Sequence, residues 1–409
     1  MSASDPFSEL IAPFSRRGVD LGLDRLEAAL ADLGHPERRF AAVQVAGTNG
    51  KGSISTMLQA IATAAGIRCG LYTSPHLLSW CERIRLPDGL IKSEHLQRLL
   101  RDLQPLALRH DLTPFELVTA AAMQAFAEAG AELVVLEVGL GGRLDATTVH
   151  PNRQVLAFAS IGLDHTEHLG PTISAIATEK AGVLHGSAMA ISGPQPDEAA
   201  QVLTAQAKRF GCSLRWVTPL PALEEGGPEL GLRGDLQRVN AAVAAGAAEA
   251  LAALGWPINA AAIEQGLKQA RWPGRLDHRL FAGQPLLVDG AHNPPAATAL
   301  RHELDQLERR TPGATPRRWL IGMQRHKDAP ELLRTLLRRG DQVRVVALPE
   351  EHNSWSAAEL QAATGRAMEQ AEGDLQDQLH WLVQSPALPV ACGSLYLVAE
   401  LLPLLNATD

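Results

Sequence analysis

A glycine-rich turn is the first segment of this chain whose residue types could perform chemistry. The sequence VAGTNGKGS, Val45 to Ser53, lies between a predicted strand, Ala41–Ala46, and a predicted helix around Ser53–Ala65. Glycines allow backbone N–H groups to turn inward toward phosphate oxygens, and a helix N-terminus adds further free donors. Lys51 would reach the outer phosphates of a nucleotide, and the hydroxyl of Ser53 would face Mg²⁺.

The turn departs from the strict P-loop pattern at two positions. Val45 stands where the first glycine is expected, and Gly52 stands where a serine or threonine should follow the lysine. A glycine-rich turn of purely structural use is therefore the alternative. A second predicted strand, Arg68–Tyr72, completes a strand–helix–strand unit. In that context the turn predicts a nucleotide-binding site.

A carboxylate interrupts the apolar strand predicted at Leu133–Val138. Glu137 lies near the carboxyl end of this strand, where ligands bind in open α/β sheets. Burying a charge there is costly unless it is paired, and a Mg²⁺ ion beside the phosphate loop would pair it. The alternative is an ordinary glutamate turned to solvent. Gly139, Gly141 and Gly142 favour the first interpretation because they indicate a close backbone approach.

A histidine and a lysine follow further along the chain. His165 lies just beyond the strand predicted at Val155–Ser160, at the carboxyl end of a neighbouring strand. Histidine can bind Mg²⁺ but is not a preferred ligand, so a structural histidine is an equal alternative. Lys180 belongs to the sequence TEKAG on or near a helix. From the residues alone, a solvated lysine on a helix face is the better interpretation.

These residues require an α/β framework to position them. Helical and strand patterns alternate throughout the chain, which favours α/β architecture with largely parallel sheets. The length of 409 residues favours two domains. Pro219–Gly234 reads as a surface excursion, and RWPGR at Arg271–Arg275 ends a helical pattern, after which a second α/β pattern begins. The Ala-rich segment Asn240–Leu254 reads as a helix. Further strands are predicted at Ala188–Ser192, Pro285–Val288, Arg318–Gly322, Gln342–Leu348 and Leu388–Cys392.

Composition restricts the partners and the compartment. The net charge is −8, which leaves too little basic surface for a nucleic-acid backbone, so nucleic acid is not expected. The four cysteines are scattered without a CxxC pair, which is typical of reduced thiols in a cytoplasmic protein. The start, MSASDPFSEL, has no basic and apolar signal segment, and no apolar run reaches the length of a membrane span. We therefore expect a cytoplasmic protein, independent of membranes.

The order of motifs resembles one family, folylpolyglutamate synthase and dihydrofolate synthase of the Mur ligase superfamily. The motifs extend from residue 47 to residue 400: GTNGKGS, TSPHL, LEVGLGGRLDAT, LDHTEHLG, EKAG, PGR, DGAHN and GSLYLVAE. The resemblance implies an α/β fold with a P-loop ATPase domain, a mainly parallel sheet and a smaller Rossmann-like C-terminal domain. Its boundaries would be 1–275, binding ATP and folate, and 276–409, a glutamate ligase domain, with substrates in the cleft between them.

The resemblance also implies roles for individual residues. Lys51, Lys180, His165 and Arg275 would be catalytic. ATP would be bound by Gly47, Thr48, Asn49, Gly50, Lys51, Gly52, Ser53, Asn240 near the adenine, Arg275, Asp289 and His292. The Mg²⁺ ions would be bound by Ser53, Ser74, Glu137, His165 and Lys180, the last as a carbamylated lysine, which reverses the interpretation from residues alone. Asp235-Leu236-Gln237 and Thr148 depart from the family pattern without touching the phosphate and metal residues.

The implied reaction is an ATP-dependent amide ligation. The carboxylate of dihydropteroate or of a (tetrahydro)folate would attack the γ-phosphate of ATP, and the amine of L-glutamate would attack the resulting acyl phosphate. A monomeric, bifunctional enzyme acting on these small molecules is expected. The alternatives are another Mur-type amino-acid ligase and a P-loop switch or transport NTPase, which would not need a second domain carrying DGAHN.

Overall fold

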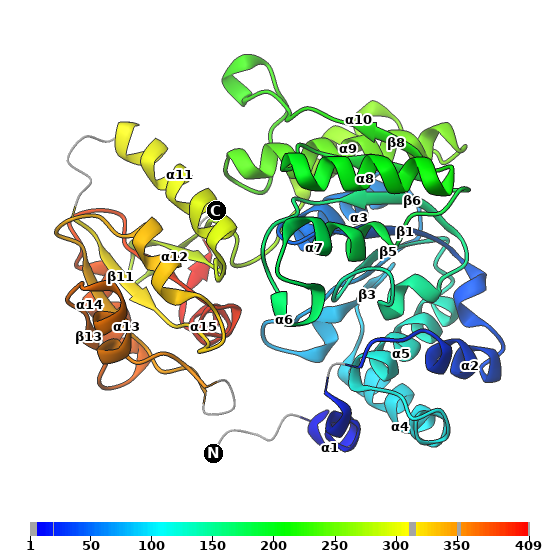
Figure 1. Ribbon diagram of the computed structural model, residues 1–409, viewed down its shortest axis with the longest axis horizontal. Coiled ribbons are helices and arrows are strands. Elements are labelled where there is room, and N and C mark those ends of the chain that lie inside the picture. The colour runs from blue at the N-terminus through cyan, green and yellow to red at the C-terminus, as the bar shows by residue number, and fades with distance from the viewer. Residues whose placement is uncertain (1–5, 19, 311–315, 350–352, 408–409) are drawn as a thin grey trace. The chain divides into compact units, whose positions relative to one another are not determined.

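The computed structural model describes residues 6–18, 20–310, 316–349 and 353–407. The chain divides into two compact units (Figure 1). The first unit extends to Gly231 and resumes at Gln237–Arg271, and the second comprises Leu232–Leu236 and the chain from Trp272 onward. The second unit thus begins at Trp272, slightly before the boundary expected after Arg275, and it also takes a short segment from the middle of the first.

The first unit is built on a mainly parallel sheet of eight strands in the order β4-β3-β2-β5-β1-β6-β7-β8. The antiparallel pairings, β2 with β3 and β3 with β4, lie at one edge, where β3 runs opposite to the other strands. The central strands β1 and β5 are buried along their whole length, as expected for a parallel sheet covered on both faces. The strands are β1 Ala41–Ala46, β2 Cys69–Tyr72, β3 Ile84–Leu86, β4 Gly89–Leu90, β5 Leu133–Glu137, β6 Arg153–Phe158, β7 Met189–Ser192 and β8 Ser213–Trp216.

Helices of this unit pack on the sheet and on one another. A Cβ added to Gly266 of α10 would lie 2.7 Å from the Ile61 side chain of α3, which shows how closely these two helices approach. Helix α5 begins with Pro114 at its first position and a capping box between Thr113 and Glu116. The helices are α1 Ser8–Ile11, α2 Asp24–Asp32, α3 Lys51–Ala64, α4 Ser93–Arg109, α5 Pro114–Glu128, α6 Thr166–Leu169, α7 Ile173–Ala181, α8 Asp197–Phe210, α9 Asp235–Ala253, whose start lies in the short segment of the second unit, and α10 Ala260–Gln269.

The second unit contains a seven-stranded sheet in the order β13-β12-β11-β14-β10-β9-β15. Strands β10 to β14 are parallel, and β9 and β15 add antiparallel edges. The strands are β9 Asp277–Phe281, β10 Gln284–Asp289, β11 Arg318–Ile321, β12 Gln342–Val345, β13 Glu369–Gln370, β14 Val390–Cys392 and β15 Asn406–Ala407. The helices are α11 Pro294–Arg310, α12 Ala329–Leu336, α13 Ala357–Thr364, α14 Leu375–Val383 and α15 Leu395–Leu401.

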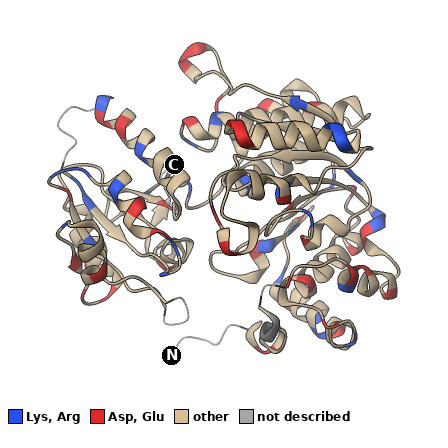
Figure 2. Ribbon diagram, in the orientation of Figure 1, with Lys and Arg blue, Asp and Glu red and all other residues tan. Residues whose placement is uncertain are grey.

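The architecture confirms the predicted α/β class. Every strand predicted from the sequence is present, although β12 ends at Val345 and not at Leu348, and β6 ends at Phe158 and not at Ser160. The reason is that the residues after β6 turn to the phosphate loop, where the Ser160 carbonyl accepts two N–H groups. Acidic and basic residues are interspersed along both units (Figure 2). Along the described part of the chain, no helix combines the length and the apolar character of a membrane span.

Candidate active site

The phosphate loop joins the end of β1 to the start of α3, as predicted. Gly47 and Gly50 have φ values of 138° and 99°, a backbone region that side chains rarely adopt. A Cβ at Gly47 would lie 2.6 Å from the Cβ of Ala159, and one at Gly50 would collide with the side chain of Asn240. Glycine is therefore required at both positions, and the structure places the buried Asn240, predicted near the adenine, directly against this loop.

Two N–H groups of the loop do not point into a phosphate cradle. Those of Thr48 and Asn49 donate to the Ser160 carbonyl at 2.8 and 3.2 Å, and the Thr48 hydroxyl bonds with the backbone of Gly162. The chain after β6 competes for these two N–H groups, so they are not available to a phosphate. The donors suited to a phosphate are those of the first turn of α3, from Lys51 onward, which have no partners within the helix.

Two lysines meet at this loop. The Nζ of Lys180, near the end of α7, donates to the Gly47 carbonyl at 2.7 Å, and Nζ of Lys51 donates to the Thr48 carbonyl at 3.1 Å. Only 4% of Lys180 is exposed, so a solvated helix lysine is wrong. Burial, helped by the charge of Lys51, lowers the pKa of Lys180 from its ordinary 10.5 to about 7. Its neutral amine is therefore accessible near neutral pH.

Glu137 and Ser74 come together at the ends of neighbouring strands. Strands β2 and β5 are parallel, and the backbone N–H of Ser74, just after β2, donates to Glu137 Oε2 at 3.2 Å. Glu137 is 4% exposed, so its carboxylate is not turned to solvent. On its other side β5 pairs with β1, where Val45 lies opposite Glu137. The carboxylate thus lies beside the strand that leads into the phosphate loop.

Ser53 lies in the first turn of α3 with its side chain buried. Within the described chain its Oγ has no hydrogen-bond partner, which is costly for a buried hydroxyl. The hydroxyls of Ser55 and Thr56 also lack a partner within the described chain. Ser53 differs from them because it lies in the first turn of α3, next to Lys51 and Gly52. A ligand at the loop would satisfy this hydroxyl.

His165, unlike Ser53, Glu137 and Lys180, is not buried. Its side chain is 42% exposed, and its backbone is left-handed with φ 49°, at the N-cap of α6. The ring lies 4.0 Å from an oxygen of Asp164 and 3.9 Å from one of Glu167. The structure therefore places His165 among carboxylates at the end of the β6 connection, and its role as a Mg²⁺ ligand stays a prediction.

Three predicted residues form a cluster in the second unit. Asp289, at the end of β10, accepts the N–H groups of Leu276 and Ala291 at 2.8 Å each. Burial raises the pKa of Asp289, while the charge of Arg275 opposes this shift. Arg275 itself donates to the Gly274 carbonyl at 3.0 Å, and His292 Nδ1 donates to the Gly290 carbonyl at 2.8 Å. The carboxylate of Asp289 thus has a structural function in addition to any role at ATP.

Asp145 is a site residue to which the sequence assigned no role. Its Oδ2 accepts the N–H groups of Gly139 and Leu140 at 3.0 Å each, and its Oδ1 accepts from the N–H and hydroxyl of Thr147. Burial raises the pKa of Asp145, and these hydrogen bonds oppose the shift. Asp145 therefore fixes the glycine-rich loop that follows Glu137. The pattern Asp-Ala-Thr, an aspartate capping a turn, is the signal that could have revealed it.

The donors present fit Mg²⁺ in part. Among the described residues, no three His, Cys, Asp or Glu side chains gather into a ready-made metal site. One buried carboxylate, Glu137, and the hydroxyl of Ser53, which lacks a partner within the described chain, are available at the loop. Mg²⁺ characteristically takes one or two carboxylates together with waters and substrate phosphates, so this sparse set of oxygens suits it. Lys180 could join the set only after conversion to a carbamate.

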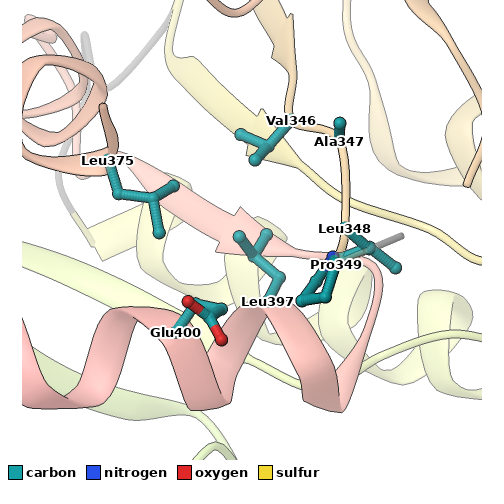
Figure 3. A pocket seen from close by; sticks show the side chains of 7 residues that line it. All are labelled: Val346, Ala347, Leu348, Pro349, Leu375, Leu397 and Glu400. Atoms are coloured by element: carbon teal, nitrogen blue, oxygen red, sulfur yellow. The ribbon is translucent and has the colours of Figure 1, made fainter. Parts of the chain in front are cut away.

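The second unit contains a cavity of about 280 Å³. Its walls include Val346, Leu348, Leu375 and Leu397, and Glu400 supplies the charged group (Figure 3). None of the predicted nucleotide or metal residues lines it. Because it offers a carboxylate and no cation, it is unsuited to a phosphate.

Comparisons with known proteins agree with this arrangement. Residues 278–404 match the family model described as the C-terminal domain of dihydrofolate synthetase. The dihydrofolate synthetase of Saccharomyces cerevisiae is 32% identical over 426 residues, covering 95% of this chain and 99% of the relative.

Solved structures show the same likeness. The structure of E. coli FolC in complex with DHPP and ADP has a TM-score of 0.83 and 28% identity, covering 98% of this chain and 97% of that one. A bifunctional folylpolyglutamate synthase/dihydrofolate synthase from Yersinia pestis, complexed with AMPPNP and Mn, has a TM-score of 0.82 and 29% identity, with 98% of each chain covered. On the identity and coverage of these relatives, the chain belongs to the dihydrofolate synthase/folylpolyglutamate synthase family.

Proposed function

We propose that this protein is an ATP-dependent ligase that adds L-glutamate to dihydropteroate, to (tetrahydro)folates, or to both. The observation that carries the proposal is the position of Lys180, whose Nζ lies 2.7 Å from the Gly47 carbonyl of the phosphate loop. A switch NTPase has no evident use for a buried second lysine at this loop. Membership of a family whose relatives are named for this ligation supports the same assignment.

The proposed reaction proceeds in two steps. An oxygen of the acceptor carboxylate forms a bond to the γ-phosphorus of ATP while the bond from that phosphorus to the β–γ bridging oxygen breaks, releasing ADP. The glutamate amine then forms the C–N bond to the acyl carbon, phosphate leaves, and the amine loses a proton. The protein contributes mainly positioning and charge neutralisation in such a phosphoryl transfer. We assign these tasks to Lys51 and the N-terminus of α3, with Arg275 adding positive charge.

Mg²⁺ would neutralise negative charge on the transferred phosphoryl group when it is bound. We assign its binding to Ser53, Ser74, Glu137, His165 and carbamylated Lys180. The support is the pairing of Ser74 with Glu137 at 3.2 Å and the buried hydroxyl of Ser53. We assign ATP and folate binding to residues 1–275 and glutamate ligation to residues 276–409. We further infer a cytoplasmic monomer that acts on small molecules and not on nucleic acid.

Product identity tests the proposal. Purified protein is supplied with ATP, Mg²⁺ and glutamate, and with dihydropteroate or tetrahydrofolate in separate reactions, and the products are analysed by mass spectrometry. Gain of one or more glutamyl residues on either acceptor supports the proposal and shows whether the enzyme has one activity or two. Release of ADP that requires neither an acceptor nor glutamate would indicate a switch NTPase. Ligation of a different acid would indicate another Mur-type ligase.

A further inference from the structure

Gln44 is an amide that lies fully buried in the central strand β1. Its Nε2 donates to the hydroxyls of Thr147 and Thr148 at 2.9 and 2.8 Å, and its Oε1 accepts from Arg153 at 2.7 Å. Both donors of the amide and its oxygen are therefore used. A polar side chain in an apolar strand costs stability unless it is satisfied in this way. Through Thr147, Thr148 and Arg153, the amide connects two neighbouring parts of the first unit.

One side of this connection is the loop that follows Glu137. The Thr148 hydroxyl donates to the Gly142 carbonyl at 2.7 Å, and the Thr147 hydroxyl donates to Asp145 at 2.6 Å. A hydroxyl has a single hydrogen, so both threonines can only accept from residue 44. The position therefore requires a side chain with two donors.

The other side is the last turn of α7, which carries Lys180. Arg153 donates to the Val183 carbonyl at 2.9 Å, just beyond this helix. Gly142 packs so closely on the same turn that a Cβ there would lie 2.9 Å from the carbonyl oxygens of both Glu179 and Lys180. The last turn of α7 is thus fixed by Gly142 of the loop after Glu137 and by Arg153. Gln44 hydrogen-bonds to Arg153 and, through Thr148, to this loop.

We infer that Gln44 is a positioning residue, which acts through Thr148 and Arg153 to hold the Lys180 amine against the phosphate loop. This inference rests on the proposed function for its kinetic test, because only a ligase reaction would report the position of Lys180 by turnover. In the described part of the structure, no side-chain hydrogen bond joins Gln44 to Lys51, Lys180 or Glu137. Its effect would be transmitted through the two partners.

Gln44→Glu is the most informative variant. The carboxylate has nearly the same size and still accepts from Arg153, but it has no donors for two hydroxyls whose hydrogens are already committed. Thr148→Val removes the one hydroxyl that links Gln44 to the Gly142 carbonyl, and Thr148→Ser retains it. Gln154→Leu is the matched control, because Gln154 is adjacent to Arg153 on β6. Among the described residues its side chain has one hydrogen bond, accepted from Trp256 Nε1 at 2.8 Å, which the substitution removes.

Two readouts distinguish positioning from simple destabilisation. In the nucleotide-free protein, amide hydrogen exchange in segments 139–148 and 179–183 should accelerate in Gln44→Glu and not in Gln154→Leu. With ATP and both substrates, kcat should fall on the order of tenfold or more, while KM for glutamate stays within about twofold. Thr148→Val should show a smaller decrease, and Thr148→Ser should behave like the wild type. If Gln44→Glu does not fold, the two Thr148 variants carry the test.

Several results would overturn the inference. One is a Gln44→Glu protein with wild-type exchange and turnover, and another is a Gln154→Leu protein with the same losses at the same melting temperature. A wild-type protein that forms no glutamylated product would refute the proposed function instead, and the exchange measurement would still test the position of the α7 turn.

Discussion

The backbone N–H of Ser74 donates to Oε2 of Glu137 at 3.2 Å, across the parallel strands β2 and β5. This bond holds a buried carboxylate at the ends of two strands, next to the strand that enters the phosphate loop. A charge in such a place is stable only if it is compensated. The first prediction follows from this pairing.

Glu137→Gln should reduce ligation by on the order of a hundredfold or more, because the amide oxygen still accepts from Ser74 but the negative charge is lost. The melting temperature of the metal-free protein should change little. Steady-state rates measured against Mg²⁺ concentration, after removal of metal with EDTA, check both points. Wild-type turnover at ordinary Mg²⁺ would show that Glu137 is not a metal ligand.

Lys51→Ala should reduce turnover by about a thousandfold, because the residue supplies charge to the transferred phosphoryl group. Within the described part of the chain, the side chain of Lys51 hydrogen-bonds to the Thr48 carbonyl alone, so the fold should survive its loss, as circular dichroism would show. Lys208→Ala is the matched control, since Lys208 lies exposed in the last turn of α8. Similar turnover in the two variants would contradict the assignment of the loop.

Lys180 should carry a carbamate in the active enzyme. Carbamylation needs a neutral amine, and burial of Lys180 beside Lys51 provides one. Labelled bicarbonate should give a carbamate carbon signal by NMR that is absent from Lys180→Ala. That variant should be nearly inactive, and short carboxylic acids should restore part of its activity. A crystal structure with the metal sites filled and an ordinary lysine side chain would refute the modification.

His150 should make the protein sensitive to acid. Burial, together with the charge of Arg153, lowers the pKa of His150 from 6.5 to about 3. Between these values the unfolded chain binds a proton that the folded chain does not, so stability falls as the pH drops from 6.5 toward 3. His150→Leu should therefore show a smaller decrease in melting temperature over this range. An identical decrease in both proteins would mean that His150 does not contribute.

Asp289 and His292 should respond differently to substitution. Asp289→Ala leaves the buried N–H of Ala291 and the partly buried N–H of Leu276 without their acceptor. The buried group alone should cost about 1–3 kcal/mol, so the melting temperature should fall clearly. His292→Ala removes one bond to a carbonyl and should mainly lower turnover. Thermal unfolding and steady-state kinetics of both variants check this. A large stability loss in His292→Ala would indicate a structural role for that residue too.

The strands of the fold were predictable where burial dominates. Apolar runs such as Ala41–Ala46 are long enough to stand out, and β1 has these bounds in the structure. The sequence did not predict six strands that lie at or near the sheet edges. They are short or at least partly exposed, so they lack a continuous apolar signal: β3, β4, β8, β9, β13 and β15.

The site was predictable in its types of residue and less so in its contacts. The sequence indicated a phosphate loop, but not that Ser160 would take the amides of Thr48 and Asn49, because that contact joins residues far apart in the chain. Lys180 looks solvated in isolation, since its burial depends on the distant loop around Gly142. Pairings of this kind become visible only when the sheet is assembled.

The segment Leu232–Leu236 belongs to the second unit although the chain on both sides of it belongs to the first. A hydrogen bond ties this segment to the later part of the second unit: the carboxylate of Glu303 accepts the N–H of Asp235. A fragment cut at residue 272 would therefore lack part of its own unit and expose this partner. During synthesis on the ribosome, the second unit can complete its folding only after the chain beyond Trp272 has emerged, although its first segment, Leu232–Leu236, emerges earlier.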